Sequence, residues 1–219
     1  MEKPLSVPTL WVVGQRNLWG DFGDALISGY ARRETDDGPL SLHRTGPFLP
    51  PISFPWIPNT GGQGVVVSAE VKRQLETLEL PGVTFREAAK ARIIPLAWER
   101  WDRSSPVPGV PPDGGEPENY IWEKTHDADS AAKMSRAYEL VAPVGPVSVD
   151  QVEDPEWGYL DEFKAQTIPA EVPPITRSHP THGHLVVNQR MKAWLGENAG
   201  EWVRFSPVRL AKPGRPPRG

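Results

Sequence analysis

The same arrangement of apolar and polar positions occurs twice along the chain, 120 residues apart, in residues 64–87 and 184–208. Each copy opens with a short β-branched run, which favours a strand, and then reaches Ser68 or Asn188, side chains typical of a helix N-cap. Apolar residues follow at helical spacing, and a glycine-containing break precedes a Val-x-Phe alternation typical of a strand. The pattern predicts two strand–helix–strand units.

Four apolar residues mark the faces of the two predicted helices that should be buried. Val71 and Leu75 share one face of the first helix, and Met191 and Leu195 share the matching face of the second. We expect them beneath one sheet or two similar ones. Short segments of this kind also resemble one another by chance, so both duplication and coincidence stay open. With 26 prolines and 20 glycines, the chain is expected to adopt an α+β fold in which long Pro/Gly-rich loops join a mixed or antiparallel sheet.

A proline- and glycine-rich stretch without apolar periodicity separates the two copies. This stretch, residues 104–118, predicts either a linker between a first half (1–103) and a second half (119–210) or a surface loop on one compact domain of internally repeated structure. Residues 211–219 are basic and rich in proline and glycine, and we expect a disordered tail.

The remaining segments carry weaker patterns. The expectations are a strand in residues 9–14, either a helix or a hairpin in 17–38, an extended proline-rich path in 43–58, a strand in 93–101, a strand in 119–122, a helix capped by Asp129 and continuing through residue 140, and loops in 143–175.

Composition narrows the possible functions. The chain has 219 residues and no cysteine, which excludes disulfides, thiolate metal sites and a cysteine nucleophile. A net charge of −4 argues against nonspecific binding to nucleic acid or to an anionic membrane. No apolar run approaches the roughly 20 residues of a membrane span, and no charged segment followed by a long apolar core opens the chain. We therefore expect a cytoplasmic protein.

Three histidines within six residues, His179, His182 and His184, are the strongest candidate metal ligands. They lack the His-Glu-x-x-His spacing of a zinc helix, and Pro180 and Gly183 predict a turn in this segment. We expect no metal, no cofactor and no catalytic residue. A small metal-dependent hydrolase that uses these three histidines is the alternative.

The two repeated segments also resemble a known group of proteins. The sequences VVVSAEVKRQLETLELPGVTFRE and LVVNQRMKAWLGENAGEWVRFSPV are similar to immunity proteins of bacterial polymorphic toxin systems, in particular the myxobacterial double-CXXCG family and related immunity families. The resemblance implies a non-enzymatic protein that binds and neutralises a cognate toxin. Because this chain has no cysteine, the zinc site of the CXXCG pairs does not carry over.

Residues 150–162 are the candidate partner-binding segment. They contain six carboxylates and no basic residue, so a total charge of −4 leaves the rest of the chain at +2. Aromatic residues inside an acidic loop can anchor a partner with a basic surface. The residues expected to bind are Glu153, Asp154, Glu156, Trp157, Tyr159 and Asp161. A solvated acidic loop is the alternative, and the segment around Phe54 and Trp56 is the next candidate surface.

Overall fold

The computed structural model describes residues 9–16, 18–35, 38–58, 62–154, 158–178 and 183–211, with the backbone alone for residues 154 and 158–161. The predicted basic tail beyond residue 211 lies outside this range. The helices are α1 (Gly20–Ile27), α2 (Ala69–Glu76), α3 (Pro117–Glu123), α4 (Ala128–Lys133) and α5 (Gln189–Ala199), with a 3-10 turn at Trp98–Arg100.

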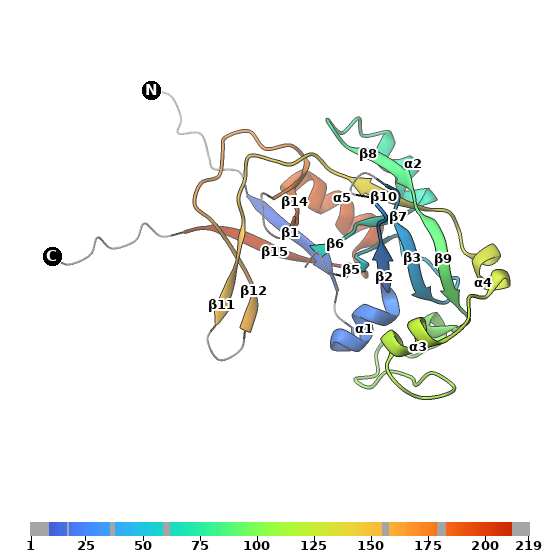
Figure 1. The fold of residues 1–219 in the computed structure, drawn as a ribbon. Helices are drawn as coiled ribbons and strands as arrows, with labels where there is room; N and C mark the ends of the chain where they lie inside the picture. The colour runs from blue at the N-terminus through green and yellow to red at the C-terminus, as the bar shows by residue number, and fades with distance from the viewer. Residues whose placement is uncertain are drawn as a thin grey trace, which may run out of the picture.

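The strands form three sheets (Figure 1). In spatial order the six-stranded sheet contains β11 (Asp150–Asp154), β12 (Gly158–Ala165), β15 (Val203–Leu210), β1 (Leu10–Gln15), β14 (Leu185–Asn188) and β13 (Ile175–Arg177). The four-stranded sheet contains β4 (Ile52–Ser53), β7 (Val66–Ser68), β10 (Ala137–Val141) and β8 (Thr84–Glu87). The five-stranded sheet contains β6 (Gly62–Gln63), β5 (Trp56–Ile57), β2 (Tyr30–Arg32), β3 (Ser41–Thr45) and β9 (Ala89–Ile94). The α+β class and the mixed strand pairing are confirmed.

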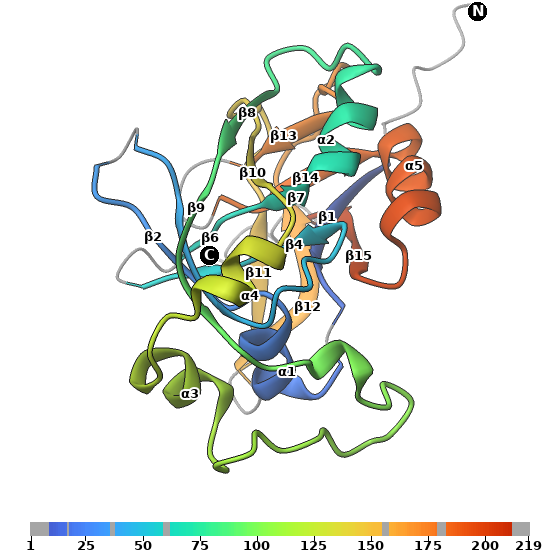
Figure 2. The same ribbon diagram turned by 90° about the vertical axis from the view of Figure 1, so that its right-hand side faces the viewer.

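Both predicted segments have the order strand, helix, strand: β7–α2–β8 and β14–α5–β15. The two expected caps are present, because the Ser68 hydroxyl accepts a hydrogen bond from the Val71 amide (3.3 Å) and the Asn188 side chain accepts one from the Met191 amide (3.0 Å). These bonds satisfy amides that the first helical turn leaves free. Figure 2 shows α2 and α5 in the same upper part of the molecule.

Each segment encloses a third strand that runs antiparallel to both of its own strands. β10 lies between β7 and β8, and β1 lies between β14 and β15. The registers match at the 120-residue offset, since Leu140 is opposite Phe85 in one unit and Val13 is opposite Phe205 in the other. Another strand adds outside each pair, β4 beside β7 and β13 beside β14. The units therefore have the same four-strand order, although they belong to different sheets.

A lysine lies over two aromatic rings at the same place in both units. The Lys72 ammonium is 5.1 Å from the Tyr138 ring centroid and 5.6 Å from that of Phe85. The Lys192 ammonium is 3.2 Å from the Trp11 ring centroid and 5.8 Å from that of Phe205. These distances are within the range of a cation–π interaction. In each unit the contact joins the helix to the enclosed strand and to the returning strand.

The main core takes residues from both sides of the 104–118 stretch. Val71, Leu75, Met191 and Leu195 are at most 3% exposed and belong to one hydrophobic cluster, which confirms the predicted buried faces. The same cluster contains Trp98 from before the stretch, together with Ile175 and Val203 from after it.

Two elements after residue 116 differ from the prediction. The strand expected in residues 119–122 is part of α3, where Pro117 occupies the first turn and is buried together with Tyr120 and Ile121, three and four residues later on the same helix face. The helix expected to be capped by Asp129 begins two residues earlier, with Asp127 as its cap, and ends at Lys133. The following segment forms β10 because partner strands are available on both of its sides.

Three further segments resolve or correct the sequence expectations. The 17–38 segment, expected as either a helix or a hairpin, contains the helix α1 and then β2, which pairs antiparallel with β3. The strand expected in 93–101 is instead β9, which ends at Ile94 before Pro95, and the 3-10 turn follows. The loops expected in 143–175 contain the two strands β11 and β12.

A fully buried arginine fixes α1 against β3. Arg44 Nη2 donates to the Ile27 carbonyl (3.0 Å) and the Phe48 carbonyl (2.7 Å), and the neighbouring Thr45 hydroxyl donates to the Leu26 carbonyl (2.9 Å). Burial lowers the pKa of Arg44 to about 10, so the guanidinium stays charged at neutral pH. Its charge faces the carbonyl end of α1, where a cation is favoured.

Truncation of the matched helix residues should destabilise the fold. Leu75→Ala and Leu195→Ala should each lower the free energy of unfolding by about 2–5 kcal/mol, because each leaves a cavity in the core. Urea denaturation of the variants measures this change. Leu210→Ala is the matched control, since Leu210 is 48% exposed, and it should stay close to the original protein. A small change at both buried positions would contradict the core assignment.

Each strand–helix–strand segment takes its enclosed strand from the other side of residues 104–118, so two fragments of the chain should associate to form the complete fold. A cut between Asp113 and Gly114 falls in the exposed loop, and it separates β1 from β14 and β15, and β10 from β7 and β8. Fragments 1–113 and 114–219 should form a 1:1 complex when coexpressed, whereas each alone should lack cooperative unfolding. Size-exclusion chromatography and thermal denaturation measure both outcomes. Cooperative unfolding of either isolated fragment would show that the enclosed strand is dispensable.

Candidate functional site

The acidic candidate segment forms a β-hairpin, not the predicted loop. β11 and β12 extend away from the helices and the other two sheets (Figure 1). The hairpin is joined to the sheet at its base, where Phe163–Ala165 of β12 pair in parallel with Val208–Leu210 of β15. Phe163 and Ala165 are buried and alternate with exposed Glu162 and Lys164, as expected for a strand with one face in the core. This burial holds the segment in the sheet despite its acidic composition.

The hairpin brings some of the predicted binding residues together. Glu153 is exposed in β11, and its position is directly opposite Tyr159 in β12. Asp154 ends β11 opposite Gly158, and Asp161 lies within β12. The side chains of Asp154, Tyr159 and Asp161 are outside the described part of the structure, as are Glu156 and Trp157 entirely. The structure therefore places the Glu153 side chain on the hairpin and Asp154 and Tyr159 by their backbone register.

β11 forms an open edge of the six-stranded sheet. The β11–β12 register shifts between Gln151 and Glu153, which marks an irregularity in this edge strand. Charges and irregularities on an edge discourage another strand from adding to it. Glu162 is 3.9 Å from Arg209, but the side chains are 50% and 67% exposed, so this ion pair is weak and Glu162 stays accessible to a partner.

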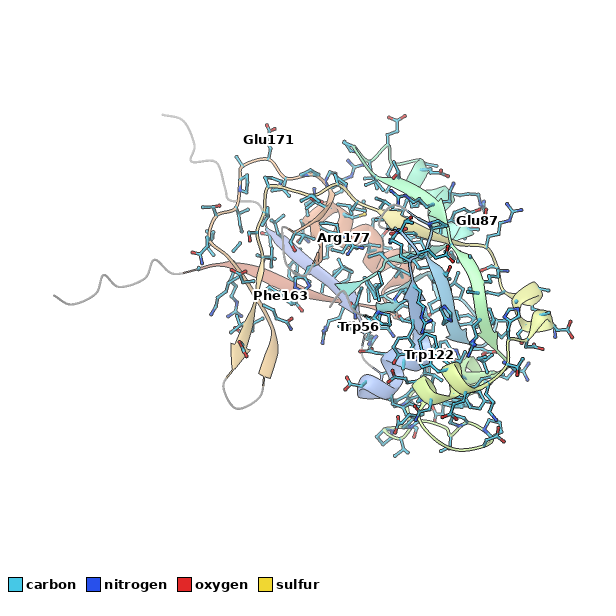
Figure 3. The ribbon with its side chains drawn as sticks, in the orientation of Figure 1. Trp56, Glu87, Trp122, Phe163, Glu171 and Arg177 are labelled. Atoms are coloured by element: carbon cyan, nitrogen blue, oxygen red, sulfur yellow. The ribbon has the colours of Figure 1, made fainter. Side chains whose placement is uncertain are left out.

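A pocket of about 350 Å³ lies where the base of the hairpin meets β5 and β6. Figure 3 shows Trp56, Phe163 and Arg177 in this central part of the molecule. Arg177 Nη1 donates to the Gln63 carbonyl (3.2 Å) and to the Gly183 carbonyl (2.5 Å), which connects β6 to the residues just before β14. The lining residues come from β1, β5, β6, β11, β12, β13, β14, β15 and adjoining loops: Val12, Val13, Gly14, Phe54, Trp56, Gly62, Gln63, Val65, Gln151, Phe163, Arg177, Gly183, His184, Leu185, Arg204 and Ser206.

The structure describes one of the three candidate histidines. His184 lies edge-on to Phe163, with 5.0 Å between ring centroids, and lines the pocket. His179 and His182 are outside the described residues. Within the part of the chain that is described, no group of three His, Cys, Asp or Glu side chains could hold a metal ion. Convergence of the three histidines stays untested.

The second candidate binding surface is the segment around Phe54 and Trp56, and these two aromatic residues differ in exposure. Phe54 is 4% exposed and belongs to the core, whereas Trp56 is 42% exposed and contributes to the pocket wall. Both residues line the pocket, and Trp56 offers a ligand the larger exposed surface.

Asp24 and His43 are partly buried side chains outside the pocket lining, and both have shifted pKa values. Burial, with help from Asp21, raises the pKa of Asp24 to about 6, while Arg204 opposes the shift. Burial together with Arg32 and Arg92 lowers the pKa of His43 to about 4, so His43 is neutral at pH 7. Asp24 therefore carries a charge at neutral pH that its surroundings disfavour.

Replacement of Asp24 should change the pH dependence of stability. Because its folded pKa is above the usual value of 3.8, the folded state binds the proton more tightly, and stability from this group is lost as pH rises from about 4 through 6. Asp24→Asn should therefore gain stability relative to the original protein at pH 8 compared with pH 4. Urea unfolding at both values measures the difference, with Asp129→Asn, at an exposed aspartate of α4, as the control. An equal difference at the two pH values would contradict the shifted pKa.

None of the helices in the described ranges is long and apolar enough to cross a membrane. No protein-family model matches the chain, and no curated protein and no solved structure shows significant similarity to it.

Proposed function

We propose that this chain is a non-enzymatic immunity protein that binds and neutralises a cognate bacterial toxin through its acidic β11–β12 hairpin. The observation that carries the proposal is the projection of this hairpin from the body of the molecule (Figure 1). The resemblance of the two strand–helix–strand segments to immunity proteins supplies the class of partner. The resemblance and the hairpin are independent features of the chain.

The hairpin has the electrostatic properties that this task needs. Its six carboxylates in residues 150–162 contrast with the net positive charge of the rest of the chain, and exposed Glu153 and Glu162 belong to its strands. Toxins that act on nucleic acids or nucleotides have basic clefts, and an acidic arm directed at such a cleft increases the rate of encounter. β11 is already paired with β12 before any partner binds. Strands that are preformed in this way lower the entropic cost of association.

The proposal includes a cytoplasmic location. A cysteine-free chain suits a reducing compartment, and a toxin that attacks nucleic acids or nucleotides must be blocked where those substrates are.

The first test identifies the partner and its effect on cells. A partner copurified from the native host should inhibit growth when it is expressed alone, and coexpression of this chain should restore growth. A partner that is harmless alone, or whose toxicity this chain does not relieve, would contradict the immunity function.

The second test measures the contribution of the hairpin to binding kinetics. On an immobilised toxin, combined reversal of Glu153, Asp154 and Glu156 to lysine should slow association by about tenfold or more and weaken its dependence on salt. Trp157→Ala should mainly speed dissociation, at a cost of about 2 kcal/mol if Trp157 is a binding hot spot.

Glu87→Lys is the control for charge reversal. Glu87 is exposed on β8, on the side of the molecule away from the hairpin (Figure 3). This variant should associate at a rate close to that of the original protein. If the hairpin variants and Glu87→Lys are indistinguishable, the toxin-binding surface lies elsewhere on the chain.

A further inference from the structure

Among the described residues that line the pocket at the base of the hairpin, the charged side chains are cationic. Its lining contains two arginines, Arg177 and Arg204, and one histidine, His184, and no aspartate or glutamate is among the described lining residues. This excess of positive charge is unusual in a chain whose total charge is −4. A cavity lined in this way favours an anionic occupant.

The surroundings of Arg177 make an anion more favourable still. Burial lowers the pKa of Arg177, and the repulsion of Arg33 acts in the same direction. Glu139 opposes these effects, but it already forms an ion pair with Arg33 at 2.6 Å. Among the described residues, Glu139 therefore faces two guanidinium groups, those of Arg33 and Arg177. An anion in the pocket would be attracted to the guanidinium of Arg177.

Arg204 supplies a second cationic group from a different strand. It belongs to β15, whereas Arg177 ends β13, and β1 and β14 lie between these strands in the sheet. The Arg204 side chain is exposed and lines the pocket. Asp24, a carboxylate that interacts with Arg204, is not among the described residues that line the pocket.

The rest of the wall is suited to a compact apolar group. Trp56 and Phe163 contribute aromatic rings, and Val12, Val65 and Leu185 contribute aliphatic surface. A volume of about 350 Å³ is at the lower end of the range for small-molecule sites. It suits an occupant about the size of a substituted benzene ring better than a polymer.

We propose that this pocket is a binding site for a small organic anion, a carboxylate or a phosphate monoester, whose acidic group contacts Arg177 and Arg204 and whose compact apolar body packs on Trp56 and Phe163. The site is separate from the proposed toxin-binding function and does not depend on it.

Titration calorimetry with simple probes tests the charge requirement. Benzoate and phenyl phosphate should both bind to the full chain, and their relative affinities distinguish a carboxylate site from a phosphate site. Inorganic phosphate should bind more weakly than phenyl phosphate because it lacks the apolar body. Benzyl alcohol and benzylamine should bind much more weakly than either organic anion. Absence of binding by both organic anions, or equal binding of benzylamine, would overturn the proposal.

Three variants locate the binding site. Arg204→Gln should lower the affinity for the more tightly bound of the two organic anions by about tenfold or more, because the substitution removes a charged hydrogen-bond donor. Trp56→Ala should lower the affinity for phenyl phosphate but leave the affinity for inorganic phosphate nearly unchanged. Both side chains are exposed, so these variants should fold. Arg73→Gln, on the exposed side of α2, is the matched control and should bind like the original protein.

The outcomes also separate this site from toxin binding. Equal anion affinity in Arg204→Gln, Arg73→Gln and the original protein would overturn the proposed pocket. Charge reversal at Glu153 should leave the affinity for the anions within about twofold while it slows toxin association. Loss of toxin neutralisation with intact anion binding, or the reverse, therefore identifies which of the two proposals fails.

Discussion

The fold depends on antiparallel pairing between strands that are far apart in the sequence. β1 lies between β14 and β15, near the other end of the described chain, and β10 lies between β7 and β8. Each strand–helix–strand segment therefore obtains its middle strand from elsewhere in the chain. A strand with a neighbour on both sides satisfies its backbone donors and acceptors only when both neighbours are present. This requirement links the regions before and after residues 104–118 into one core. During folding, the entropic cost of closing these long loops comes before the strand pairing that offsets it.

The repeated lysine contacts explain why distant positions in the sequence share a pattern. Lys72 and Lys192 each lie on the helix of a unit and contact an aromatic residue on the enclosed strand and a phenylalanine on the returning strand. The stem of a lysine can cover apolar surface while its ammonium group interacts with the face of a ring. Matching registers, caps and lysine contacts are the features that a duplication would leave, although descent from one duplicated unit stays a prediction.

Local chemistry made some elements predictable and long-range pairing made others unpredictable. Ser68 and Asn188 cap their helices through amides three residues away, so the sequence alone contains the relevant information. β10 forms because of β7 and β8, and no nearby residue encodes those partners. In the hairpin, buried Phe163 and Ala165 alternate with exposed Glu162 and Lys164, as in a strand. The preceding run of acidic residues instead suggested a loop. The pocket left no local pattern either, because Arg177 and Arg204 approach it from strands that are not neighbours in the sheet.

The two proposed binding regions share structural elements. Gln151 in β11 and Phe163 in β12 line the pocket, while the same strands carry the acidic arm. If both proposals hold, an anion that packs on Phe163 contacts the base of the arm and stabilises its pairing with β15. A partner that shifts the arm would then change the affinity for the anion, and thermodynamic linkage requires the anion to change the affinity for the partner by the same factor. If the arm keeps one position in both states, the factor is one, and the two sites are energetically independent although they share strands.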